Sequence, residues 1–171
     1  VLPLITPYLT GVDYGIIGVL SAYIGALSAF HLLGFLVVVT NAFYHHPNQY
    51  KWFWRQVYGF LWLWSIVYFA IVAVVIYYTL PVEAYTHRWA IIGMKIFPLL
   101  MFGVSDMLAS TYYRLNHKAL PIATRSLFAG LLAMALNYYF IAQLRMGYMG
   151  WITSEFITHI ISGILFFIPV Y

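Results

Sequence analysis

The sequence predicts an all-α integral membrane protein, a bundle of five complete transmembrane helices. Of its 171 residues, 64% are hydrophobic and only 7% are charged. A soluble domain of this length could not bury so much apolar surface in one core. Turn-forming residues divide the chain into apolar stretches that reach the roughly 20 residues needed for a spanning helix. We therefore expect a single transmembrane lobe over residues 1–171.

Five apolar stretches are expected to cross the bilayer. They are residues 14–44, 53–80, 89–113, 120–144 and 149–170. The loops between them are short, so neighbouring spans are expected to run antiparallel. The chain has no cysteine, which excludes disulfides, thiolate metal sites and cysteine nucleophiles.

Each stretch has its own boundary signals. The first carries a face of small residues, which lets another helix approach closely, and it ends at the His-His-Pro-Asn sequence of residues 45–48. The second ends before Pro81. The third contains Pro98, which lacks an N–H and is expected to bend the helix. The fourth has Pro121 in its first turn, and the fifth follows the turn at residues 145–147.

The loop charges predict an orientation. Basic residues in the loops near 45–55 and 114–125 outnumber those on the other side. On that other side, the loop charges Arg88 and Arg145 are offset by Asp13 and Glu83. The loops near 45–55 and 114–125 are therefore expected to be cytoplasmic, so that the chain starts outside and ends inside. The net charge of +4 is spread over loops and helix ends, which predicts no nucleic-acid partner.

The predicted spans contain the charged residues Lys95, Asp106 and Glu155. Charges at membrane depth are costly, so they are expected to face a protein-lined aqueous space. Lys95 and Asp106 lie eleven residues apart, nearly on one helical stripe, which Arg88 extends. The alternative is that Asp106 pairs with a basic residue on a neighbouring span as a structural bridge, while Arg88 reaches outward to the interface.

Two histidines add to the candidate polar groups. Glu155, His159 and Ser162 share one face of the last stretch and could form either a proton or cation relay or an interhelical hydrogen-bond cluster. His31 lies midway through the first stretch, where a lone histidine is more often a hydrogen-bonding partner. The ligand spacing predicts no metal site, and no catalytic motif predicts an enzyme.

Three stretches resemble one known family. They are Tyr8–Gly15 (YLTGVDYG), Pro98–Asn116, which ends in STYYRLN, and Gly147–Trp151 (GYMGW). They are similar to the amino-terminal lobe of polysaccharide flippases, the lipid-linked oligosaccharide exporters of the multidrug/oligosaccharidyl-lipid/polysaccharide (MOP) superfamily. The resemblance covers nearly the whole chain. It implies that the five stretches are helices two to six of a MATE-like six-helix lobe, in a fragment of a two-lobe transporter.

The resemblance also implies a function. Such a transporter moves a sugar on an isoprenoid pyrophosphate-type lipid across the plasma membrane, the bacterial inner membrane, by alternating access. The expected partners are this lipid-linked oligosaccharide, membrane lipids and the missing carboxy-terminal lobe; no cofactor is expected. The candidate substrate-binding residues are Lys95, Arg88 and Arg125. The candidate ion-coupling residues are Asp106, Glu155, His159 and His31.

Three other functions stay open. Asp106 and Glu155 depart from a purely cationic cavity and fit a cation-coupled exporter of small molecules from the multidrug branch. A membrane redox protein could hold haem between His31 and His159 on different spans. A non-catalytic membrane scaffold would direct Lys95 and Asp106 at partner helices.

Overall fold

The computed structural model describes residues 5–167, which contain helices and no strand. The long elements are α2 (Gly11–His31), α3 (Phe35–His45), α4 (Tyr50–Thr79), α5 (Arg88–Leu115), α6 (Ala119–Asn137) and α7 (Gly147–Phe167). Short helical turns complete the order: η1 (Thr6–Tyr8), η2 (Val82–His87) and the π-helical η3 (Tyr138–Gln143). The all-α class predicted from the sequence is confirmed.

Four segments of the described chain are long and apolar enough to cross a membrane. They are Gly11–His31, Tyr50–Thr79, Val82–Leu115 and Ala119–Gln143. The sequence predicted five complete spans, and that number is not reached within residues 5–167. The predicted stretch 149–170 corresponds to α7, and its last residues, 168–170, lie outside the described residues. The structure therefore supports a membrane-embedded protein with four candidate spans.

The prediction of one continuous helix over residues 14–44 is wrong. The chain breaks between α2 and α3, where Leu33 and Gly34 have φ angles of 46° and 74°. Glycine adopts this left-handed conformation at little steric cost. Side chains of α4 donate hydrogen bonds to carbonyl groups beside the break. Trp64 Nε1 donates to the His31 carbonyl at 3.1 Å, and the Tyr68 hydroxyl donates to the Leu27 carbonyl. These bonds satisfy backbone groups where the helix ends.

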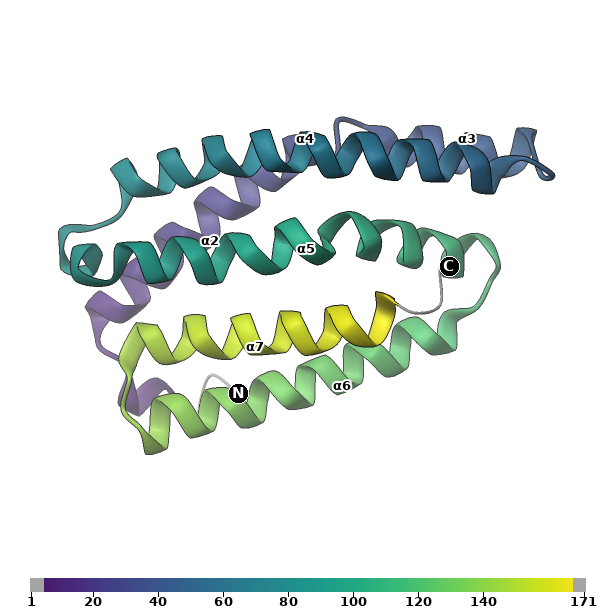
Figure 1. Cartoon of the computed structure of the whole chain (residues 1–171). Helices are drawn as coiled ribbons and strands as arrows, with labels where there is room; N and C mark the ends of the chain where they lie inside the picture. Colours follow the sequence, from purple (N-terminus) through teal and green to yellow (C-terminus); the bar gives the residue numbers. More distant parts are fainter. Residues whose placement is uncertain (1–4, 168–171) are drawn as a thin grey trace.

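The long helices lie side by side in the order α4, α5, α7 and α6 (Figure 1). Because α6 returns antiparallel between them in the chain, α5 and α7 run in the same direction. Helix α2 crosses behind α4 and α5 at an angle, and its first residues lie beside the start of α7 (Figure 1). Helix α5 thus contacts α4 on one side and α7 on the other, which places its polar residues in the middle of the bundle.

Two apolar clusters hold the helices together. One joins α2, α4, α5 and α7 and includes Ile16, Ile76 and Ile152; the other joins α3, α4 and α5 and includes Val39 and Val104. Many large apolar side chains nevertheless remain exposed along the helices, and the apolar window of α6 has no buried residue. Apolar surface on the outside of a helical bundle is typical of contact with lipid.

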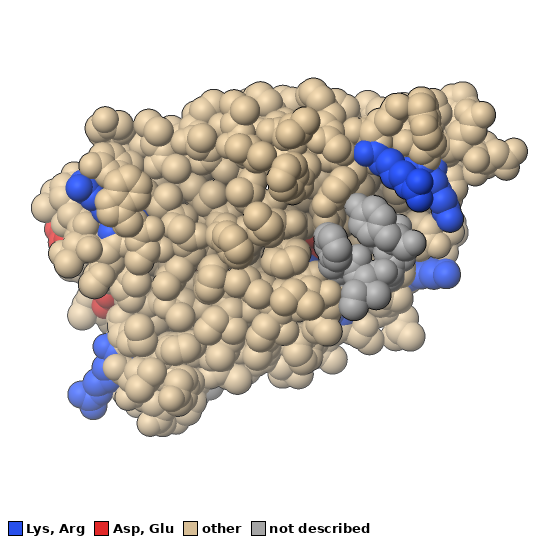
Figure 2. Space-filling model, in the orientation of Figure 1, with Lys and Arg blue, Asp and Glu red and all other residues tan. Residues whose placement is uncertain are grey.

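Charged side chains gather at the two ends of the molecule. Figure 2 shows basic atoms at both ends of the long axis, acidic atoms at one of them, and little charge on the face between the ends. The connections 46–49 and 116–118 lie at one end, and the connection between α4 and α5 lies at the other (Figure 1). This separation agrees with a membrane-embedded protein. Which end faces the cytoplasm stays a prediction.

Candidate functional site

The first charged contact joins α5 to α7. The Lys95 ammonium forms an ion pair with Oε2 of Glu155, and Trp151 Nε1 donates to Oε1 of the same carboxylate at 2.7 Å. The Trp151 and Glu155 side chains meet because they lie four residues apart, one turn along α7. The lysine side chain is 12% exposed and the glutamate side chain 33% exposed. Both carboxylate oxygens are therefore bonded, although the glutamate still reaches the surface.

The second charged contact joins α5 to α6. Arg125 Nη1 pairs with Oδ1 of Asp106, and Arg125 Nε donates to the Ser162 hydroxyl on α7 at 2.8 Å. Arg125 thus links three helices through one guanidinium group. Its side chain is 19% exposed, against 43% for that of Asp106. This is the pairing that the bridge alternative predicts for Asp106, and it is also compatible with a residue that borders an accessible space.

His159 lies between the two ion pairs on α7. It is one turn after Glu155 and three residues before Ser162, so the three side chains share a helix face as the spacing predicted. The charges of Glu155, Lys95 and Arg125 act on its imidazole. We call this group the polar seam; it consists of Lys95, Asp106, Arg125, Glu155, His159 and Ser162. Its two cations and two carboxylates cancel, which lowers the cost of placing them among apolar helices.

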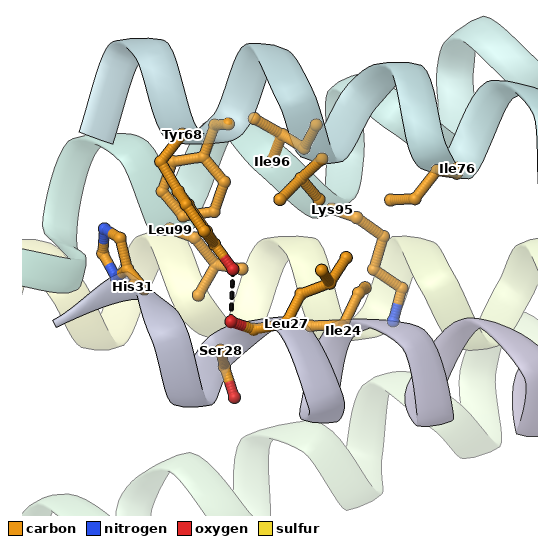
Figure 3. A pocket seen from close by; sticks show the side chains of 11 residues that line it. Ile24, Leu27, Ser28, His31, Tyr68, Ile76, Lys95, Ile96 and Leu99 are labelled. Atoms are coloured by element: carbon orange, nitrogen blue, oxygen red, sulfur yellow. Dashed lines mark hydrogen bonds between the residues drawn. The ribbon is translucent and has the colours of Figure 1, made fainter. Parts of the chain in front are cut away.

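An apolar cavity adjoins Lys95 on the other side. It lies between α2, α4 and α5 and has a volume of about 50 Å³. Figure 3 shows the lysine stem bordering this space beside Ile24 and Ile96. Two polar side chains on its wall are already bonded, because the Ser28 hydroxyl donates to the Gly25 carbonyl and Tyr68 donates to the Leu27 carbonyl. Lys95 therefore stands between a hydrocarbon-lined space and a carboxylate.

His31 borders the same cavity, but its hydrogen bond goes to α4. Its Nε2 lies 2.7 Å from the Ser65 hydroxyl, which in turn donates to the Leu61 carbonyl at 2.6 Å. Since the serine proton is used by Leu61, His31 Nε2 acts as the donor in this arrangement. The ring packs against Tyr68 and Phe69 at centroid distances of 5.1 and 4.8 Å. These contacts are those of a buried hydrogen-bonding partner.

These contacts do not support the haem alternative. His31 Nε2, a nitrogen that could ligate iron, is bonded to Ser65.

Arg88 lies with aromatic residues at the end of the bundle. Its guanidinium carbon is 4.4 Å from the centre of the Tyr77 ring and 5.8 Å from that of Tyr85. Such cation–π contacts stabilise an arginine at an interface. The structure brings Lys95 and Arg125 into one seam along α7 and places Arg88 apart from it, among these rings.

Sequence reasoning missed the role of Asp13. It counted this residue as a loop charge, whereas the carboxylate is buried and accepts the Thr10 N–H at 2.8 Å and the Tyr148 N–H at 2.9 Å. It therefore caps α2 and also holds the first turn of α7. The Thr-x-x-Asp spacing is a capping-box signal that could have been recognised. The contact with Tyr148, 135 residues away, had no local signal.

Comparison with protein-family models, with curated proteins and with solved structures finds no match to this chain. The resemblance to the flippase lobe therefore stays a prediction from sequence motifs. Two of those motifs are adjacent in space, since Asp13 from the first bonds to Tyr148 from the third.

Proposed function

We propose that this chain is part of a membrane transporter that moves a lipid-linked oligosaccharide across the plasma membrane by alternating access. The observation that carries the proposal is the position of Lys95, whose stem borders an apolar cavity and whose ammonium lies in the polar seam. An amphiphile with an anionic phosphate next to a hydrocarbon chain needs this combination of surfaces. The candidate spans support a membrane location.

The cations of the seam have the chemistry for this substrate. A lysine ammonium attracts phosphate as a point charge, and an arginine guanidinium can bind two phosphate oxygens at once. Lys95 and Arg125 are both drawn toward α7, by Glu155 and Ser162 respectively. The partial exposure of Glu155 and Asp106 supports a seam that borders accessible space. We therefore assign substrate binding to Lys95 and Arg125, and not to Arg88, which lies among aromatic rings at the end of the bundle.

One observation favours a second candidate, the non-catalytic scaffold. Both ion pairs connect different helices, as purely structural bridges would. Replacing a buried ion pair by apolar residues as a pair is often neutral for stability, whereas removing one partner is not. A paired substitution can therefore separate a structural role from a role in transport.

The test is the double variant Lys95→Met with Glu155→Met in the full protein, reconstituted into proteoliposomes with labelled lipid-linked oligosaccharide. We expect a folded protein whose transport rate falls by roughly tenfold or more, because the phosphate loses its counter-charge. Lys51→Met with Glu83→Met is the matched control, since it removes the same charges from exposed positions. Normal transport by the folded seam variant would favour the scaffold. Efflux of a cationic dye in place of lipid-linked sugar transport would favour the multidrug exporter.

A further inference from the structure

We propose that Glu155 and Asp106 occupy the anion-binding positions of Lys95 and Arg125 in the resting protein, so that the anionic substrate group binds by displacing them. This inference rests on the proposed function and adds an order of events to it. The seam is then a site closed by its own carboxylates rather than a set of free cations. Each carboxylate is an internal competitor of the substrate phosphate.

The first observation is the pairing itself. Lys95 and Arg125, the two cations of the seam, are both bound to a carboxylate in this structure. A carboxylate and a phosphate oxygen make the same kind of charge-assisted hydrogen bond to an ammonium or a guanidinium. Either anion can therefore satisfy these donors, but a phosphate that approaches first meets the negative charge of the carboxylate.

The second observation is which member of each pair is more exposed. In both pairs the cation is the more buried side chain and the carboxylate is the more exposed one. The carboxylates therefore lie toward the accessible side of the seam, and the cations lie behind them. A substrate anion that reaches Lys95 or Arg125 from that side takes the place of Glu155 or Asp106.

The third observation is that neither carboxylate would be buried without a partner after its displacement. When Glu155 is displaced from Lys95, its carboxylate keeps the Trp151 N–H as a donor at 2.7 Å, and its side chain already reaches the surface. Asp106, the most exposed of the four charged side chains, also reaches the surface. Neither displaced carboxylate has to stay buried without a partner, which would be the costly outcome.

The direct test measures binding of a short-chain prenyl diphosphate to the detergent-solubilised full protein, with the corresponding prenyl alcohol as the uncharged control. Glu155→Gln and Asp106→Asn remove each competitor while keeping the shape of the side chain. We expect each to raise the affinity for the diphosphate roughly fivefold and to leave alcohol binding unchanged. Glu83→Gln is the matched control, because it removes the same charge from an exposed position and should have no effect.

A second measurement uses the unmodified protein and does not depend on the folding of a variant. An apolar carbodiimide joins the Lys95 amine to the Glu155 carboxylate as an amide, with the carbodiimide taking up the released water as a urea. Mass spectrometry of the linked peptides reports how often the pair is closed. We expect the diphosphate, and not the alcohol, to suppress this cross-link.

The outcomes separate the inference from the proposed function. Unchanged diphosphate affinity in both carboxylate variants, or a cross-link that persists with bound diphosphate, overturns the displacement while transport of the lipid-linked sugar still supports the function. If the unmodified protein neither prefers the diphosphate over the alcohol nor transports the lipid-linked sugar, the displacement and the proposed function are both overturned.

Discussion

The carboxylate of Asp13 controls the start of two helices. It accepts the backbone N–H and the hydroxyl of Thr10, at 2.8 and 2.7 Å, and the backbone N–H of Tyr148 at 2.9 Å. The adjacent Gly147 has a φ angle of 55°, and a Cβ atom there would lie 2.7 Å from Asp13 Oδ1. Glycine at position 147 therefore allows the close approach that brings α7 onto this carboxylate.

Replacing Asp13 by alanine should destabilise the protein. The change removes the α2 cap and leaves the Tyr148 N–H without its acceptor, so we expect the free energy of unfolding to fall by about 2–3 kcal/mol. Thermal unfolding in detergent measures this. Asp13→Asn is the control, because its side-chain oxygen can still accept and it should lose less. Equal melting temperatures for the alanine variant and the unmodified protein would contradict a double cap.

At the scale of elements, the break between α2 and α3 shapes the cavity wall. Trp64 and Tyr68 of α4 bind carbonyl groups of His31 and Leu27, so α4 fixes the end of α2. Non-helical backbone at membrane depth is tolerated where protein surrounds it or where it borders a cavity. The cavity lies against the last two turns of α2, consistent with that rule.

Helix α7 is held against α5 by a close approach at Gly163. A Cβ atom at this position would lie 2.5 Å from the Phe102 ring. Gly163→Ala should therefore push the helices apart and lower the free energy of unfolding by about 1–3 kcal/mol. Gly130→Ala on α6 is the matched control, since nothing lies within 4 Å of its Cβ position. Thermal unfolding of the two variants tests this, and equal stability of both would show that Phe102 moves aside freely.

At the scale of the whole molecule, the distribution of charge divides the protein into two polar ends and an apolar middle. The charges in the middle are paired within the polar seam, whereas those in the connections remain at the ends (Figure 2). This arrangement limits the number of charges that a bilayer would have to accommodate. It also makes the predicted orientation open to direct measurement.

The absence of native cysteine allows single-cysteine labelling without background. Asn48→Cys and Thr86→Cys place a thiol at exposed positions in connections at opposite ends of the bundle. An impermeant maleimide added to intact cells should label position 86, while position 48 should react only after the membrane is opened. Reversed labelling would overturn the orientation. Labelling of both positions from outside would overturn the crossing by α4.

Sequence periodicity located most helix boundaries because apolar length and turn residues are local properties. It predicted the bounds of α4 and α5 within a few residues, and those of α6 when η3 is included with it. It also identified the charged residues that form the seam. It failed at residues 32–34, where Gly34 lies in a continuous apolar stretch. The side chains that bind the carbonyl groups beside that break come from α4, about 30 to 40 residues later.

The sequence by itself determined that this protein is helical, that its helices are apolar enough to cross a membrane, and that a few charges lie within these helices. These conclusions follow from composition and spacing along the chain. Only the tertiary structure decided that Lys95 meets Glu155, that Asp106 meets Arg125, and that an apolar cavity adjoins the lysine. Each of these contacts joins different helices, and their partners depend on how the helices pack, a long-range property that no local pattern encodes.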